Sequence, residues 1–216
     1  MPLDSADIKF CYTGEATGPT NNTLSLGGTI SGSPPNTIPD TVNNIFDDVT
    51  GDESESGDTE YRGIAIYIDT ISSSGSFDLI RPRIWISGYS TDAPDTISIA
   101  PSTFGLNADT MGVCANESSA PDEDLSGLWV EEGSGSTIYF NSDGSPTLTK
   151  PATEGTLSSE HWVGLWLRRV VPESASAYNN RVCTITVQGE TSASPYKSIV
   201  KKIWIIQWNR DRISVF

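Results

Sequence analysis

The chain has 216 residues, with 13 Lys and Arg against 28 Asp and Glu, a net charge of −15 and a pI near 4.2. An acidic balance of this size disfavours nucleic acid as a main partner, because neutralising phosphates requires a basic surface. The longest strongly apolar run, residues 203–206, is far shorter than the roughly 20 residues that a membrane-spanning helix requires. We therefore expect no nucleic-acid partner and no membrane partner.

The charge is divided unevenly along the chain. Residues 1–149 contain 4 Lys and Arg and 23 Asp and Glu, whereas residues 150–216 contain 9 and 5. Like charge on a long acidic surface keeps copies apart in solution, and a basic end on the same chain offers an acidic neighbour a place to dock. This division favours a protein that assembles.

Two features bear on the compartment in which the chain folds. Its opening, MPLDSADIKF, lacks the apolar stretch of a signal peptide, so we expect synthesis in a cytoplasm. Cys11, Cys114 and Cys183 are odd in number and include no CxxC motif, which argues against a disulfide framework and a zinc site. We expect free, mostly buried thiols in a reducing compartment.

Short β-branched and aromatic runs, separated by Gly, Pro, Ser, Asn and Asp, predict an all-β fold. We expect one β-sandwich or jelly-roll-like domain over residues 1–216, in which the polar stretch 13–45 forms an extended arm or a long loop. The expected strands, about eight as in such folds, are residues 6–12, 61–68, 77–86, 96–99, 137–140, 162–170, 182–188 and 199–208.

Three of these strands have a distinctive pattern. Residues 61–68 are apolar on both faces, which predicts a strand inside a sandwich or under an arm. Pro82 lacks the ladder N–H, so its strand should lie at a sheet edge or form a bulge there. Residues 199–208 are again apolar on both faces, and we expect this strand to be central or covered by a partner.

The residues of catalysis are scarce. His161 is the single histidine, and the GxSxG, P-loop, GxGxxG and HExxH motifs are absent. We therefore predict no enzyme activity, no catalytic residues and no cofactor. Glycoside hydrolysis by two carboxylates is a weaker alternative, since any acidic β-sandwich permits it on paper.

Two further patterns leave ligand binding open. The acidic residues within 47–60 offer oxygen ligands to a hard cation, but their spacing departs from an EF-hand loop, and we expect a solvated loop without metal. Trp85, Trp162, Trp166 and Trp204 lie in strand patterns, where core packing is the usual role. Two tryptophans remain as a possible sugar-stacking platform, Trp129 and Trp208.

Basic residues occur in pairs in the last quarter of the chain. Adjacent residues of a strand point to opposite faces, so such pairs do not build one patch. Because Arg and Lys suit carboxylates, we expect these cations to meet acidic loops of neighbouring subunits. The predicted partner-binding residues are Arg168, Arg169, Lys201, Lys202, Arg210 and Arg212.

Four segments carry a resemblance to a known class of protein. They are SLGG (Ser25–Gly28), NNIFDDVTGDES (Asn43–Ser54), GDTEYRGIAIYI (Gly57–Ile68) and VGLWLRRVVPESASA (Val163–Ala177). In this order they make the chain resemble virion structural proteins of tailed bacteriophages. Gly63 departs from the pattern, because relatives often have Cys or another residue after the YR pair.

The resemblance implies a particle component of the virion, made in the host cytoplasm and without catalytic residues. The expected function is to decorate and stabilise the capsid through self-association, for example as a trimer, and through binding to the major capsid protein. The alternative is a tail, collar or host-recognition protein that binds surface carbohydrate.

Overall fold

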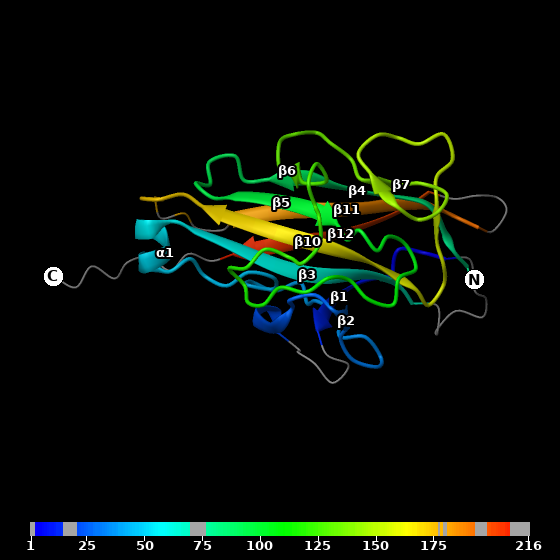
Figure 1. Ribbon diagram of the computed structural model, residues 1–216, viewed down its shortest axis with the longest axis horizontal. Helices are drawn as coiled ribbons and strands as arrows, with labels where there is room; N and C mark the ends of the chain where they lie inside the picture. The colour runs from blue at the N-terminus through cyan, green and yellow to red at the C-terminus, as the bar shows by residue number, and fades with distance from the viewer. Residues whose placement is uncertain are drawn as a thin grey trace.

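The computed structural model describes residues 3–14, 21–69, 77–176, 178, 181–192 and 198–207, without the side chains of 206 and 207. The fold is all-β, as the sequence predicts (Figure 1). Within these residues the two helices, η1 (Asn22–Leu24) and α1 (Gly51–Ser56), are far too short to cross a bilayer. The strands are β1 (Ile8–Gly14), β2 (Thr29–Ile30), β3 (Asp58–Ile68), β4 (Leu79–Tyr89), β5 (Thr96–Pro101), β6 (Val130–Glu131), β7 (Tyr139–Phe140), β8 (Pro146–Thr147), β9 (Thr156–Leu157), β10 (Trp162–Val171), β11 (Arg181–Thr191) and β12 (Ser198–Gln207).

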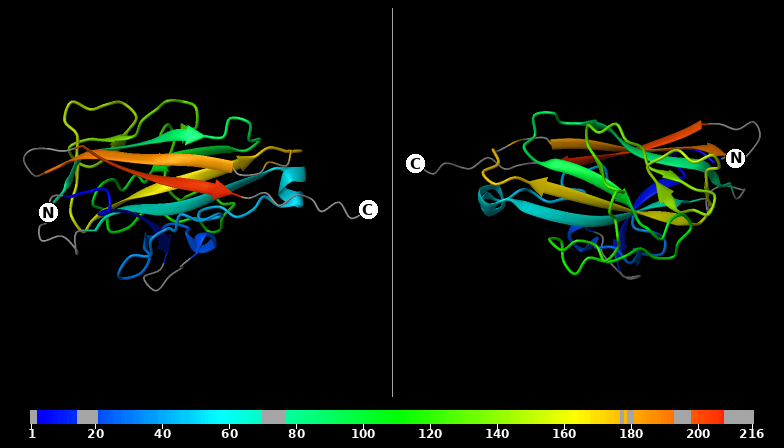
Figure 2. Two further views of the ribbon diagram at one scale, coloured as in Figure 1. Left: turned by 180° about the vertical axis from the view of Figure 1, so that it is seen from behind. Right: turned by 45° about the horizontal axis from the view of Figure 1, so that its top comes forward.

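The strands form two packed antiparallel sheets and one small hairpin. The larger sheet has the order β2-β1-β3-β10-β5-β6, the smaller has the order β12-β11-β4-β9, and β7 pairs with β8. All eight predicted strands are confirmed, and the four that the sequence did not reveal have only two residues each. In the view from behind, β12 lies along one side of the sandwich and no described segment passes in front of it (Figure 2).

The core fills the space between the sheets with aliphatic side chains. Alternation places every second residue of each strand inward, for example Ile64 and Ile66 from β3 and Ile185 and Val187 from β11, all at most 1% exposed. Burying such side chains is the main favourable term in folding, at about 25 cal/mol per Å² of apolar surface. The inner faces of the two sheets therefore hold the sandwich together.

The larger sheet is also buried on its outer face. Ala65 and Tyr67 of β3, with Trp162 and Trp166 of β10, form a second apolar cluster beneath the loops that include Leu26 and Met111. This confirms the prediction that residues 61–68 lie inside a sandwich and under a covering segment.

Pro82 lies at a bulge. The register of β11 against β4 shifts between Gln188, which pairs with Arg83, and Glu190, which pairs with Ile80. Arg81 has a φ of 54°, a conformation outside the ordinary strand range. The strand is paired with β11 and β9, so the bulge is the correct one of the two predicted alternatives.

The polar stretch 13–45 is a long loop in the part that the structure describes. Residues 21–45 lie against the chain's own sheets, and Ser25, Ser31, Asn44 and Ile45 are at most 2% exposed. Of the two predicted forms, an extended arm or a long loop, the described residues 21–45 therefore adopt the loop, packed on their own domain. Residues 15–20 lie outside the described chain.

A close backbone contact fastens this loop to the larger sheet. The hydroxyl groups of Thr13 and Ser25 both donate to the carbonyl oxygen of Gly63, at 2.7 and 2.5 Å. The Gly63 N–H in turn donates to the carbonyl of Ser25 at 2.7 Å. A Cβ at position 63 would lie 2.9 Å from the nitrogen of Gly27, so only glycine fits there without movement. The Gly63 that departs from the phage pattern thus has a structural role in this chain.

We predict that Gly63→Ala lowers the free energy of unfolding by about 1–3 kcal/mol, because its methyl group would press on the backbone of Gly27. Gly88→Ala is the matched control in a strand, since a Cβ there meets Thr184 at an ordinary 3.6 Å. Urea unfolding of both variants measures the difference, and equal stability of the two would contradict the close contact.

Candidate partner-binding edge

The first predicted pair of cations, Arg168 and Arg169, points to opposite faces of β10. Arg168 lies over the ring of Trp129, 4.5 Å from its centroid, and donates to Ser98 Oγ at 3.3 Å. Arg169 is fully buried and forms an ion pair with Glu60. The prediction that Arg169 meets an acidic neighbour is therefore wrong, because its acidic partner belongs to the same chain.

Arg169 belongs to a buried ion cluster at the end of the sandwich near α1. Glu60 pairs with Arg169 and, at 3.4 Å, with Arg62, and all three side chains are at most 2% exposed. The ring of Phe46 lies 5.7 Å from the guanidinium of Arg62 and 5.1 Å from that of Arg169. Each charge thus has a charged or aromatic partner, which a buried ion requires.

A second buried cluster lies on β11. Arg181 donates to Asp95 Oδ1 at 3.1 Å and to Glu132 Oε1 at 2.6 Å, and the three side chains are at most 9% exposed. These acids come from segments next to β5 and β6, so the cluster ties the smaller sheet to the larger one. The two clusters thus remove three arginines, Arg62, Arg169 and Arg181, from the surface together with their acidic partners.

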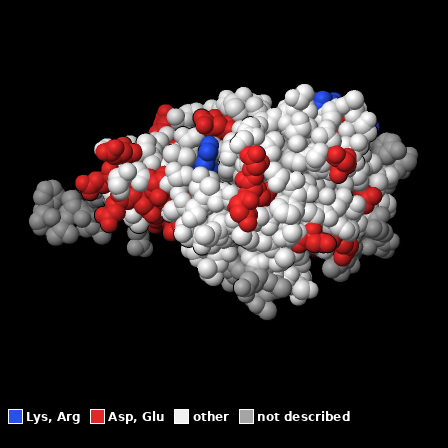
Figure 3. All heavy atoms as spheres, in the orientation of Figure 1, with Lys and Arg blue, Asp and Glu red and all other residues white. Residues whose placement is uncertain are grey.

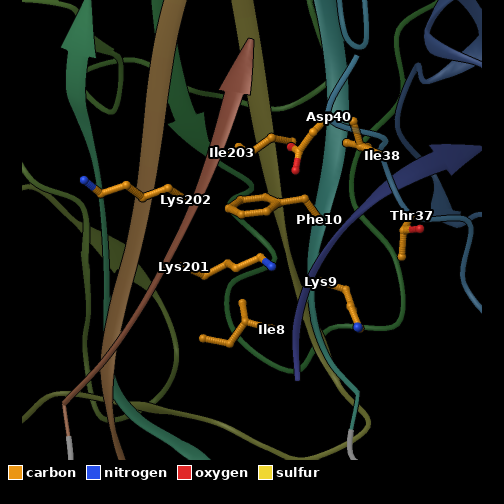
Figure 4. A pocket seen from close by; sticks show the side chains of 9 residues that line it. All are labelled: Ile8, Lys9, Phe10, Thr37, Ile38, Asp40, Lys201, Lys202 and Ile203. Carbon is orange, nitrogen blue, oxygen red and sulfur yellow. The ribbon is translucent and has the colours of Figure 1, made fainter. Parts of the chain in front are cut away.

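Lys201 and Lys202 remain accessible, on the outermost strand of the smaller sheet. Among the strands that the structure describes, β12 pairs with β11 alone, and its other side faces a groove of about 200 Å³. The groove is lined by Ile8, Lys9, Phe10, Thr37, Ile38, Asp40, Lys201, Lys202 and Ile203. Figure 4 shows the chain of Lys201 extending between β12 and β1 beneath Phe10, whereas Lys202 points away on the far side of β12. Arg210 and Arg212 lie outside the described residues.

The exposed face of β12 also carries apolar side chains. Val200 and Trp204 are each 43% exposed, while Ile199, Ile203 and Ile205 on the other face are buried. The prediction that Trp204 packs in the core is therefore wrong. Trp204 lies on the outer face of the smaller sheet, which no segment of the described chain covers. Of the two predicted alternatives for this strand, a central position is wrong, since β12 is at the edge of the smaller sheet, and cover by a partner stays a prediction.

The remaining tryptophans are distributed between core and surface. Trp162 and Trp166 are buried as predicted, and Trp85 is half-buried on the same outer face as Trp204. Trp129 packs against Tyr61, with ring centroids 6.2 Å apart, and Arg168 covers one of its faces. Trp129 is therefore a poor sugar platform, and Trp208 lies outside the described residues.

The groups that nucleophilic catalysis would use are poorly placed. Burial raises the pKa of Cys11, Cys114 and Cys183 to about 12, so these buried thiols stay protonated at neutral pH. His161 lies just before β10, where its Nδ1 donates to the carbonyl of Ser159 at 2.9 Å. Neither these thiols nor this imidazole is thus arranged as an activated nucleophile or its base.

The acidic segment 47–60 is not the solvated loop that the sequence predicts, because residues 51–56 form α1, residues 58–60 begin β3 and the Glu60 side chain is buried. The segment contains a carboxylate cluster. Oxygens of Glu53, Asp58 and Glu60 lie within 4.8 Å of one another. Glu53 accepts the N–H of Thr50 at 2.6 Å in the capping box of α1, and Glu60 is paired with two arginines. These partners disfavour a cation here, because adjacent guanidinium groups repel it.

Comparisons with known proteins leave the family open. No protein-family model matches the chain, and no curated protein matches it. Among solved structures, the chain is similar to AvmM, which catalyses macrocyclization in alchivemycin A biosynthesis, at 10% identity and a TM-score of 0.30 over 75% of this chain and 86% of that one. It is also similar to a family 123 glycoside hydrolase from Clostridium perfringens, at 8% identity and a TM-score of 0.25 over 72% of this chain and 22% of that one. Likenesses this remote carry no argument about function.

Glu60 provides a pH test of the buried cluster. Desolvation raises its pKa to about 7, although Arg169 and Arg62 oppose the rise. The folded protein then holds a proton that the unfolded chain releases above its ordinary pKa of 4.5, so stability falls as pH rises from about 4.5 to 7.

We predict that Glu60→Gln removes this dependence. Relative to the variant, the free energy of unfolding of the unaltered protein should fall by on the order of 3 kcal/mol between pH 4.5 and pH 7, as measured by denaturant unfolding. Glu190→Gln, which removes an exposed ion pair with Arg81, is the control and should change stability by less than about 1 kcal/mol. If the difference in stability between the Glu60 variant and the parent did not change with pH, the raised pKa of Glu60 would be contradicted.

Proposed function

We propose that this protein is a non-catalytic structural component of a tailed-phage particle, which decorates and stabilises the capsid by binding to itself and to the major capsid protein. The observation that carries the proposal is the edge of β12, where Lys201 and Lys202 lie beside exposed Val200 and Trp204. The four segments that resemble virion structural proteins support the same class of function.

The charge distribution supports docking at this edge. Acidic side chains gather over α1 and recur across the visible face, whereas few cations are seen there (Figure 3). Arg62, Arg169 and Arg181 are buried in ion clusters with acids of the same chain. The lysines of β12 are among the described cations that remain accessible to an acidic surface.

Attachment of this kind suits a decorating protein. Acidic copies repel one another in free solution, so we expect the protein to bind to itself on the particle, where attachment to the major capsid protein holds copies side by side. A protein that binds only the assembled shell stabilises that shell by mass action.

The second candidate is a tail or host-recognition protein that binds surface carbohydrate. It is favoured by the exposed ring of Trp204, with the half-buried Trp85 on the same outer face of the sheet. Flat aromatic faces of this kind stack on sugar rings. Binding of the protein to a glycan array, with loss on Trp204→Ala, would favour this candidate over decoration.

Addition of the purified protein to preformed capsids tests the leading proposal. We predict that it sediments with the shells and that the double variant Lys201→Glu, Lys202→Glu loses at least about tenfold in affinity, because charge reversal repels an acidic partner. Raising the salt concentration should also weaken binding of the parent protein to the shells. Lys150→Glu, which reverses one charge at an exposed loop residue, is the net-charge control for the single variants Lys201→Glu and Lys202→Glu. Failure of the parent protein to add to shells would contradict the proposal.

A further inference from the structure

We propose that β12 accepts one further β-strand, supplied by an extended acidic segment of another protein. The proposal deepens the proposed function, on which it rests for the identity of that protein. It combines three observations, namely the direction of the backbone groups of β12, the length of the open edge and the charge around it.

The backbone of β12 has hydrogen-bonding groups that face away from the sheet. The amide of Asn44 donates to the carbonyl oxygen of Trp204 at 2.8 Å, so this carbonyl points to the side opposite β11. Backbone groups of an antiparallel strand alternate in direction, which turns those of Val200 and Lys202 to the same open side. The neighbouring strand β11 shows the same alternation. The carbonyl of Val182 accepts the Ser90 N–H, so the backbone groups of Val182 point toward β4. The odd-numbered residues of β11 therefore point the other way and hydrogen-bond to β12.

The neighbouring edge of the larger sheet is already occupied. The Ile38 N–H donates to the carbonyl of Phe10 at 2.8 Å, and the Tyr12 N–H donates to the carbonyl of Asn36 at 3.0 Å. Residues 36–38 thus serve as the added strand for β1. The same chain continues to Asn44, whose amide bonds the β12 edge at Trp204. In the part of the chain that the structure describes, no strand pairs with the outer edge of Ser198–Ile203, a length of about 20 Å at 3.3 Å per residue.

The charge around the open edge selects the partner. Three lysines and one acid, Asp40, are the charged residues of the groove, in a chain that carries 28 acids against 13 basic residues. Lys201 extends into the groove and Lys202 points to the outer face (Figure 4). An added strand presents alternate side chains to these two sides, so acidic residues at either set of positions meet a cation.

A second copy of this chain fits the edge less well. Pairing of two β12 strands would bring lysines of both copies together, and lysine on an edge strand is a known means of preventing such pairing. The chain's own acidic segments are also engaged, because residues 51–56 are helical and Glu117 and Glu123 are bonded to Arg62 and Trp166. Another protein is therefore the better source of the strand.

The test uses the full chain and a labelled, end-capped peptide of alternating Glu and Thr residues. Fluorescence polarisation should detect binding of this peptide, and about tenfold weaker binding of the same peptide with Gln or Lys in place of Glu. Equal binding of the three peptides, or no binding of the Glu peptide at millimolar concentration, would overturn the proposal.

A matched pair of variants tests the backbone contact itself. Val200→Pro removes an N–H that faces the open side and leaves the β11 ladder intact, whereas Val200→Ala keeps that N–H. Affinity for the Glu peptide should fall at least about fivefold in the proline variant and change less than about twofold in the alanine variant. Circular dichroism and thermal unfolding check that both variants fold, and equal affinities in folded variants would overturn strand addition.

The same variants separate this proposal from the proposed function. Peptide binding without addition of the parent protein to shells would refute capsid decoration and leave strand addition standing. Addition of both Val200 variants to shells with equal affinity, together with no peptide binding, would refute strand addition alone. Self-association of the parent that Val200→Pro abolishes, measured by analytical ultracentrifugation, would make a second copy the occupant and overturn the choice of partner.

Discussion

Backbone N–H and C=O groups at the edge of a sheet need hydrogen-bond partners, and this sandwich meets that need differently at two neighbouring edges. At β1 the chain supplies residues 36–38 itself. At β12 the described residues supply the amide of Asn44, beside which an exposed valine, an exposed tryptophan and two lysines extend along the strand. The functional account depends on this difference, because an open edge with a positive, partly apolar border is suited to bind a strand from elsewhere.

Elsewhere in the structure, three arginines are buried in ion pairs with acids of the same chain. Glu60 lies between two buried arginines, and Arg181 lies between Asp95 and Glu132. Buried pairs of this kind stabilise little beyond what apolar packing would give, but removing one partner is costly, so they fix where each charge resides. The charged side chains on the face seen in Figure 3 are mostly acidic, whereas Lys202 of β12 is exposed and Lys201 is half-buried beside the groove.

Much of the fold could be predicted from local patterns, and the errors arose where strand order decides the outcome. Alternation along residues 182–188 and the apolar faces of 61–68 located strands correctly, and Pro82 indicated a bulge. Alternation also predicts that Arg168 and Arg169 face opposite ways, but the choice of the buried one depends on the register that sets Arg169 opposite Glu60. The edge position of β12 and the contact of Gly27 with Gly63 depend on pairings between distant segments, which no local pattern encodes.

Hydrogen exchange of the individual β12 amides, measured by NMR for the free protein and with the acidic peptide bound, tests the open edge most directly. The account predicts fast exchange at Val200 and Lys202 and slow exchange at Lys201 and Ile203 in the free protein, with the first two becoming protected when a strand is added. Slow exchange at Val200 and Lys202 in the free protein, or no gain in protection on binding, would contradict it.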